Sequence, residues 1–190
     1  QPYSYSGTMG MVGYWTMDTR FWNKMEAARL EQSICIYAAM WAGLHTYGMA
    51  HANTSIHEAA QEADYIILWG ANLVSTGVHA IPFIREAKER GAKLVVIDPR
   101  RTRTTMMSDW HIQPKPGTDA ALALGMMNEI VNNRKHDLAF LKKHTTGYKE
   151  FLDKILPKYT LDKVSRITGV KKADIKQLAH EYGSTKKTYI

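Results

Sequence analysis

The stretch DYIILWGANLVSTGVHAIPFIREAKERGAKLVVIDPRRTRTT, residues 64–105, decides the fold of this chain. It opens with a continuous apolar run over 65–69, which is typical of a strand buried on both faces. A helical face follows over 81–90, where Pro82 is tolerated in the first turn. A second apolar run over 93–98 completes a strand–helix–strand unit. Such a unit predicts two parallel strands joined by a right-handed crossover.

The sequence downstream extends this unit. Residues 110–113 predict a short third strand and residues 119–131 a helix. The remainder is helical in pattern, with one helix expected over 148–156, ended by Pro157, and an amphipathic stripe over 175–182. The predicted fold class is therefore α/β, a Rossmann-like parallel sheet with flanking helices and a helical C-terminal tail.

The sequence upstream has a different character. Residues 20–31 have helical spacing, whereas 33–44 are apolar all round, which predicts a buried helix or a strand running into a helix. The chain begins on Gln and ends on a β-prone run, so we expect an internal piece of a longer protein. We expect residues 1–31 to belong to a neighbouring domain and 32–190 to form the α/β domain.

Composition excludes several classes of protein. An apolar share of 45% suits a globular domain, and no run approaches the ~18 apolar residues that a membrane helix needs. A single cysteine, Cys35, excludes an intramolecular disulfide framework and a Cys-rich metal site built from this segment alone. The net charge of +7 favours anionic partners.

Three loops leave the carboxyl ends of the predicted strands, where open α/β sheets bind ligands. They span 70–79, 98–105 and 114–119. In the first loop Gly70 permits close backbone approach, and neutral donors lie near a helix N-terminus, as a phosphate requires. These donors are Asn72, Ser75 and Thr76.

The second and third loops add charged groups. Asp98 ends a strand where doubly wound folds hold ribose hydroxyls, and Asp119 has the acceptors that a guanine edge needs. Guanidinium groups suit a pyrophosphate. They are supplied by Arg100, Arg101 and Arg103. Each feature also has a structural interpretation, as a turn, a helix cap or a solvated face.

The other candidate functional residues are weaker evidence for a site. His45, His51 and His57 lie six apart, which suits no common helix face and no zinc pattern. The lysine pairs are scattered, which argues against a nucleic-acid-binding stripe. By its local sequence Cys35 reads as a small buried apolar residue.

Taken in order, five segments resemble the molybdopterin oxidoreductases of the dimethyl sulfoxide reductase family. They are DYIILWGAN (64–72), REAKERGAKLVVIDPRRTRT (85–104), SDWHIQPKPGTDAALALGMM (108–127), HDLAFLKKHTTGYKEF (136–151) and ITGVKKADIKQLAHEY (167–182). The resemblance implies binding of molybdopterin guanine dinucleotide, two copies around one molybdenum or tungsten in the whole protein. It further implies that residues 32–190 cradle one of these copies.

The resemblance also implies site residues. The diphosphate side would be lined by Gly70, Asn72, Thr76 and His79. Asp98 and Arg100 would hold the ribose and nucleotide, and the guanine would contact Gly117, Thr118 and Asp119.

A further implication concerns the metal. Cys35 occupies the place of the protein ligand to the metal, with Ser33 as the alternative, and a thiolate suits this metal. The next residue is Ile36, where formate dehydrogenases have His.

The resemblance implies an enzyme when full length, with two-electron redox chemistry at the metal acting on a small-molecule substrate. The 190-residue piece alone would be inactive. Expected partners are an electron-transfer iron–sulfur protein or subunit, with any iron–sulfur cluster bound outside this segment. Nucleic acid and direct membrane insertion are not expected. The expected compartment is cytoplasmic by default, or periplasmic if an upstream signal exists.

Two alternatives remain at this stage. One is a non-catalytic nucleotide-binding domain, like the central domain of thiamine-diphosphate enzymes, which would prefer adenine or no nucleotide. The other is a basic nucleic-acid module, which would bind any duplex with a steep salt dependence.

Overall fold

A computed structural model describes residues 2–3, 10, 12, 16–30, 36–49 and 55–190. The chain forms two compact units, Gln1–Asn53 and Thr54–Ile190. All four strands of the described residues belong to the second unit. The domain boundary of the intact protein after residue 31 stays a prediction.

The second unit is built on one four-stranded sheet, in the order β3-β2-β1-β4. Each neighbouring pair of strands is parallel, as expected when helices connect successive strands. The predicted strands are confirmed to within one residue at their ends. The strands are β1 (Tyr65–Trp69), β2 (Lys93–Ile97), β3 (Trp110–Ile112) and β4 (Thr188–Tyr189).

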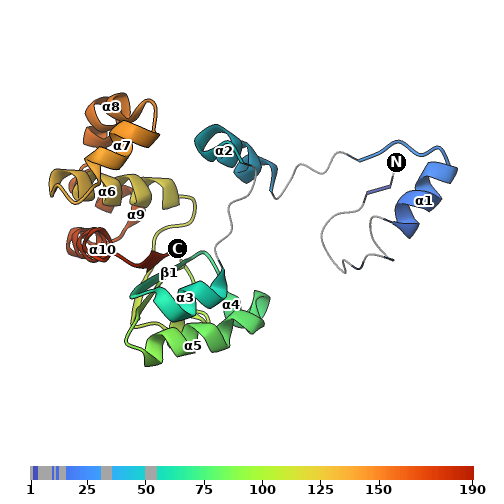
Figure 1. Cartoon of the computed structure of the whole chain (residues 1–190), viewed down its shortest axis with the longest axis horizontal. Coiled ribbons are helices and arrows are strands. Elements are labelled where there is room, and N and C mark those ends of the chain that lie inside the picture. Colours follow the sequence, from blue (N-terminus) through green and yellow to red (C-terminus); the bar gives the residue numbers. More distant parts are fainter. Residues whose placement is uncertain (1, 4–9, 11, 13–15, 31–35, 50–54) are drawn as a thin grey trace. The chain divides into compact units, whose positions relative to one another are not determined.

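Helices cover both faces of the sheet (Figure 1). On one face α3 and α5 pack together over the even-numbered side chains of β1 and β2, such as Ile66 and Leu94. On the other face the odd-numbered side chains, such as Ile67 and Val95, meet α6, α9 and α10. The helices are α3 (Ile56–Glu62), α5 (Ile81–Glu89), α6 (Asp119–Asn132), α9 (Leu161–Thr168) and α10 (Lys172–Ser184).

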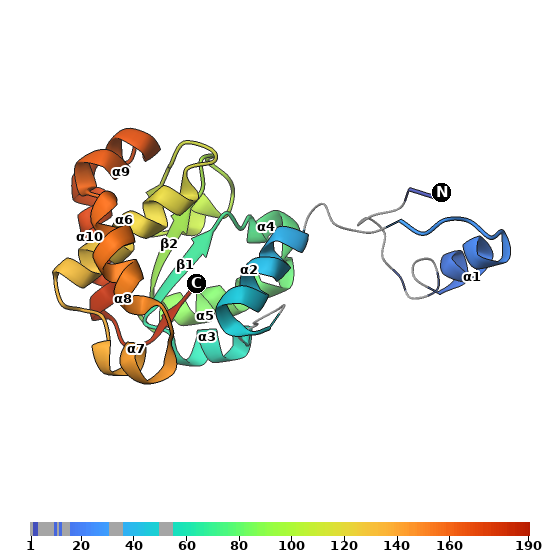
Figure 2. The same cartoon turned by 90° about the horizontal axis from the view of Figure 1, so that it is seen from above.

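This two-sided burial explains the apolar runs in the sequence. All five side chains of β2 except Lys93 are almost completely buried, as are the first four of β1. The α/β sheet with flanking helices is therefore confirmed (Figure 2).

The helical tail differs in detail from its prediction. After α7 (Leu138–His144), the expected helix over 148–156 begins as α8 (Tyr148–Glu150) but continues as a π-helical turn over Phe151–Ile155. Pro157 lies inside the closing 3-10 turn rather than after it. The ring is accommodated there because the early positions of a helical turn need no backbone N–H donor.

The first unit contains α1 (Met17–Lys24) and α2 (Tyr37–Tyr47). Within the described residues no side chain of α2 is buried, and Trp41 is 47% exposed. The helix predicted within 33–44 is confirmed for the described part of that run, and its burial stays a prediction.

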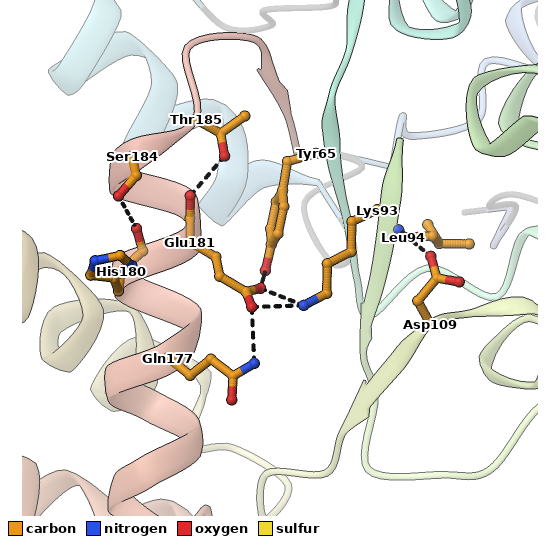
Figure 3. A network of polar contacts seen from close by, with 9 residues as sticks. All are labelled: Tyr65, Lys93, Leu94, Asp109, Gln177, His180, Glu181, Ser184 and Thr185. Carbon is orange, nitrogen blue, oxygen red and sulfur yellow. Dashed lines mark hydrogen bonds and ion pairs between the residues drawn. The ribbon is translucent and has the colours of Figure 1, made fainter. Parts of the chain in front are cut away.

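A polar network closes the amino ends of β1 and β2 and fastens α10 to the sheet (Figure 3). The ammonium of Lys93 donates to both carboxylate oxygens of Glu181 at 2.7 Å, and the hydroxyl of Tyr65 donates to Oε2 at 2.9 Å. Gln177 donates to Oε1 from one turn away. Burial raises the pKa of Glu181, but hydrogen bonds from Lys93, Gln177 and Tyr65 outweigh it and leave the pKa lowered. Burial and the Glu181 carboxylate together raise the pKa of Tyr65.

Candidate functional site

The three predicted loops meet at the carboxyl end of the sheet. The amide of Gly70, directly after β1, donates to the carbonyl of Ile97 at 2.8 Å. The amide of Asp98, directly after β2, donates to the carbonyl of Ile112 at 3.1 Å. Adjacent parallel strands therefore deliver the three loops side by side, as the sequence predicts.

The first loop begins with a backbone turn that favours glycine. Gly70 has a φ of +64°, and a Cβ placed there would meet no other heavy atom within 4 Å. The loop then forms the short helices α4 (Leu73–Thr76) and η1 (Val78–Ala80). Gly70 thus leaves open space at the end of β1, where another molecule could approach the backbone.

Asn72 and Thr76 form the hydrogen-bonded part of this loop. The Thr76 hydroxyl and amide both donate to the Asn72 carbonyl, at 3.1 and 3.0 Å. The amide nitrogen of the Asn72 side chain donates to the Ser75 hydroxyl at 3.1 Å. His79 lies exposed on η1, in the same loop. The four residues predicted to line the diphosphate therefore lie in one loop of about ten residues at the carboxyl edge of the sheet. They are Gly70, Asn72, Thr76 and His79.

A residue that sequence reasoning missed ties the first loop to the second. The Thr104 hydroxyl donates to the side-chain oxygen of Asn72 at 2.8 Å and accepts the amide of Val74 at 3.1 Å. Thr104 is only 1% exposed. The one sequence signal was that Thr104 and Thr105 are uncharged residues directly after an arginine-rich run, which is weak by itself.

In the second loop the Asp98 carboxylate has a structural task. It accepts the backbone amide of Arg100 at 2.7 Å, which forms a turn, and the residue is 9% exposed. The His111 ring contacts the Asp98 carbonyl at 2.8 Å and holds β3 against this turn. The structural interpretation of Asp98 as a turn residue is confirmed, and its role toward a ribose stays a prediction.

The arginines of the second loop carry unpaired charge. Their guanidinium groups make no ion pair with any carboxylate among the described residues, and all three residues are exposed. Unpaired guanidinium groups on a loop held in place at both ends suit an anionic partner. The three are Arg100, Arg101 and Arg103.

The third loop presents an acidic group. Gly117 has a φ of +77°, and the Thr118 hydroxyl donates back to the Lys115 carbonyl at 2.6 Å. The carboxylate of Asp119, the first residue of α6, accepts the indole N–H of Trp69 at 2.8 Å through Oδ1. This bond joins the end of β1 to the third loop and leaves Oδ2 available to a ligand.

The metal-ligand prediction falls outside the described residues, because neither Cys35 nor Ser33 is among them. Within the ranges that the structure does describe, no three His, Cys, Asp or Glu residues gather as a metal site would require. None of the helices formed by the described residues is long and apolar enough to cross a membrane.

Three kinds of chemical group lie at the carboxyl edge of the sheet. The space beside Gly70 is open and the Asn72 side chain has a free N–H donor among the described residues, the exposed arginines supply positive charge, and the Asp119 carboxylate can accept further N–H donors.

Comparison with known proteins gives a consistent result. The family model of the molybdopterin oxidoreductases matches residues 6–173. The probable oxidoreductase YoaE of Bacillus subtilis is 40% identical over 189 residues, which is 100% of this chain and 27% of that protein. The assimilatory nitrate reductase catalytic subunit of the same organism is 33% identical over 149 residues, 78% of this chain and 21% of that protein.

A solved structure is also similar. Acetylene hydratase from Pelobacter acetylenicus superimposes with a TM-score of 0.75 and 29% sequence identity over 90% of this chain and 23% of that one. The chain thus spans about a quarter of the length of the relatives that it matches. The resemblance predicted from the five sequence segments is confirmed.

Proposed function

The chain belongs to the molybdopterin oxidoreductase family, and on that premise we propose that its carboxyl sheet edge binds one molybdopterin guanine dinucleotide of a molybdenum or tungsten oxidoreductase. The observation that carries the proposal is the joining of three loops, by hydrogen bonds, around glycine, amide donors and unpaired arginines. The family membership favours this function over a thiamine-diphosphate-type central domain and over a nucleic-acid module.

Each loop has a separate task in the proposal. The first loop binds the diphosphate, the second binds the ribose and nucleotide, and the third binds the guanine. The residues are Gly70, Asn72, Thr76 and His79 in the first loop, Asp98 and Arg100 in the second, and Gly117, Thr118 and Asp119 in the third.

The cofactor supplies two-electron redox chemistry at its metal, and the protein supplies binding and orientation. Arg100 would neutralise phosphate charge through its fork of N–H donors, and Asp119 would accept N–H groups of guanine through the oxygen that Trp69 leaves free. Cys35 would bind the metal as a thiolate, because coordination keeps a thiol deprotonated. The substrate, the electron-transfer partner and the compartment stay predictions.

The test uses the full-length protein, purified without oxygen from its own host. We expect about one molybdenum or tungsten and about two guanine nucleotides per chain after acid hydrolysis, as one metal held between two pterin dinucleotides requires. Absence of both metal and guanine would contradict the proposal for the whole site.

Variants at position 35 test the metal ligand separately. Cys35→Ala is expected to lose the metal or to inactivate the enzyme, whereas Cys35→Ser keeps a weaker oxygen ligand and retains part of the metal. Ser33→Ala is the matched control and is expected to keep its metal. A metal-loaded and fully active Cys35→Ala protein would remove Cys35 from the metal and leave the nucleotide proposal intact.

A further inference from the structure

Thr104 lies between two of the loops that the proposed function assigns to the cofactor. Its hydroxyl makes two hydrogen bonds to the first loop, one from the Val74 amide at 3.1 Å and one to the Asn72 side chain at 2.8 Å. The residue is 1% exposed, so water does not replace these partners. Thr104 is therefore built into the site without being on its surface.

The hydrogen-bond inventory fixes which way the Asn72 amide points. A threonine hydroxyl has one proton, and the Val74 N–H already obliges its oxygen to accept. Among the described residues, the Asn72 side chain is the sole acceptor within reach of that proton. The atom of Asn72 that faces Thr104 must therefore be the oxygen, and the NH₂ group must point the other way.

The remaining groups of Asn72 support the same orientation. Its backbone carbonyl accepts from the hydroxyl and the amide of Thr76. One N–H of its side chain donates to the Ser75 hydroxyl, and the second has no partner among the described residues. The side-chain oxygen of Asn72 thus faces Thr104, and what its side chain offers to a ligand is a hydrogen-bond donor, as an anionic diphosphate needs.

We propose that Thr104 is a positioning residue that holds Asn72 in its donor orientation and couples the arginine loop to the diphosphate loop. The proposal rests on the proposed function, because it names a residue that acts on the same cofactor through Asn72. Without the Thr104 hydroxyl the Asn72 amide can rotate and present its oxygen, which repels a phosphate.

The experiment measures how fast the full-length holoenzyme loses guanine nucleotide during dialysis, for the wild type and five variants. Thr104→Val removes the hydroxyl at nearly constant volume, whereas Thr104→Ser keeps it. We expect about tenfold faster loss for Thr104→Val, which corresponds to one hydrogen bond between Asn72 and the cofactor, and a change within about twofold for Thr104→Ser. The matched control is Thr105→Val, because Thr105 is also buried but its hydroxyl bonds only to the backbone of Thr102, within its own loop.

A double variant separates positioning from general stability. Asn72→Ala is expected to lose nucleotide faster than wild type, and adding Thr104→Val to it is expected to cause no further acceleration, because the effect of Thr104 passes through Asn72. A purely structural role would add the same acceleration in both backgrounds. Thermal unfolding of each variant accompanies the dialysis, and if Thr104→Val does not fold, Thr104→Ala and its control Thr105→Ala, which also remove one hydroxyl each, take the place of the two valine variants.

The outcomes are distinct. A wild-type protein without guanine nucleotide would overturn the proposed function and this inference together. A wild-type protein with its nucleotide would overturn only this inference if Thr104→Val retains nucleotide normally, if Thr104→Ser fails as Thr104→Val does, or if the effect persists undiminished beside Asn72→Ala.

Discussion

The two ends of the same parallel sheet differ in whether their charged side chains have partners. At the amino ends of β1 and β2, Lys93 and Glu181 pair at 2.7 Å, with Tyr65 and Gln177 completing the set (Figure 3). At the carboxyl ends, the arginines after β2 have no carboxylate partner among the described residues. The paired charges at the amino ends, which we call the closed end, stabilise the fold, whereas we expect the unpaired arginines at the carboxyl ends to bind an anion.

The largest effect should come from removing the unpaired charges. The triple variant Arg100→Gln, Arg101→Gln, Arg103→Gln is expected to weaken retention of guanine nucleotide about a hundredfold, because charge-assisted hydrogen bonds are the strong ones. Its free energy of unfolding should change little, since these side chains have no hydrogen-bond or ion-pair partner in the part of the chain that the structure describes. Guanine released per chain after dialysis, and denaturant unfolding, measure the two effects.

The matched control neutralises three exposed lysines elsewhere. Lys142→Gln, Lys143→Gln, Lys149→Gln removes the same charge from the helical tail and should leave nucleotide retention unchanged. Equal losses in both triple variants would mean that only net charge matters and would break the comparison between the two ends.

At the closed end the expected effect is on stability alone. Glu181→Ala leaves Lys93 and Tyr65 without their acceptor, and we expect a loss of about 2 kcal/mol in the free energy of unfolding, less than for a fully buried pair because Glu181 is partly exposed. Urea unfolding measures it. Glu62→Ala, which breaks an exposed ion pair with Lys187, should cost much less. A comparable loss in both would contradict the role of the network.

A smaller effect is expected from the glycine that opens the carboxyl end. Gly70→Ala puts a side chain at a φ of +64°, which costs about 1 kcal/mol in stability. Gly147→Ala, at a φ of +75° and with equally open space, should cost about the same. Only Gly70→Ala should also lose nucleotide, and equal retention in both variants would remove Gly70 from the site.

The smallest expected effect is on how the free energy of unfolding depends on pH. The pKa of Glu181 is lowered in the folded protein, so its contribution to stability is complete above its ordinary value near 4.5 and is lost as the pH falls through the lower folded value. The free energy of unfolding should therefore fall from pH 6 to pH 3, and less steeply for Glu181→Gln. Glu150→Gln, at an exposed ion pair with Lys154, is the control and should keep the wild-type slope. Identical slopes for wild type and Glu181→Gln would show that the network does not stabilise the fold through this carboxylate.

The layers of the fold were predictable because a strand that is buried on both faces has a continuous apolar run in its own sequence. The runs that form β1 and β2 are apolar at nearly every position, and the helix between them shows its period within nine residues. The π-helical turn over Phe151–Ile155 has no sequence pattern that distinguishes it from an α-helix, since its geometry depends on how the tail packs.

In the candidate site, too, some features could be predicted from the sequence and others could not. Gly70, Asn72 and Asp119 were predictable because strand ends and motif spacing place them at one edge. The bonds that orient them join residues far apart, such as Trp69 to Asp119 and Thr104 to Asn72. The closed network was also missed, because Glu181 lies 88 residues from Lys93 and 116 from Tyr65. Only the three-dimensional structure shows which of many polar residues become partners.

The most direct test of the account is hydrogen exchange on the full-length protein, compared between cofactor-loaded and cofactor-free preparations. We predict at least about tenfold slower exchange with cofactor in the peptides covering 70–80, 98–105 and 113–119, because a bound ligand opposes local opening. Peptides covering 177–187, at the closed end, should exchange equally in both preparations. Protection confined to the closed end, or absent from all three loops, would contradict the claim that the carboxyl edge holds the nucleotide.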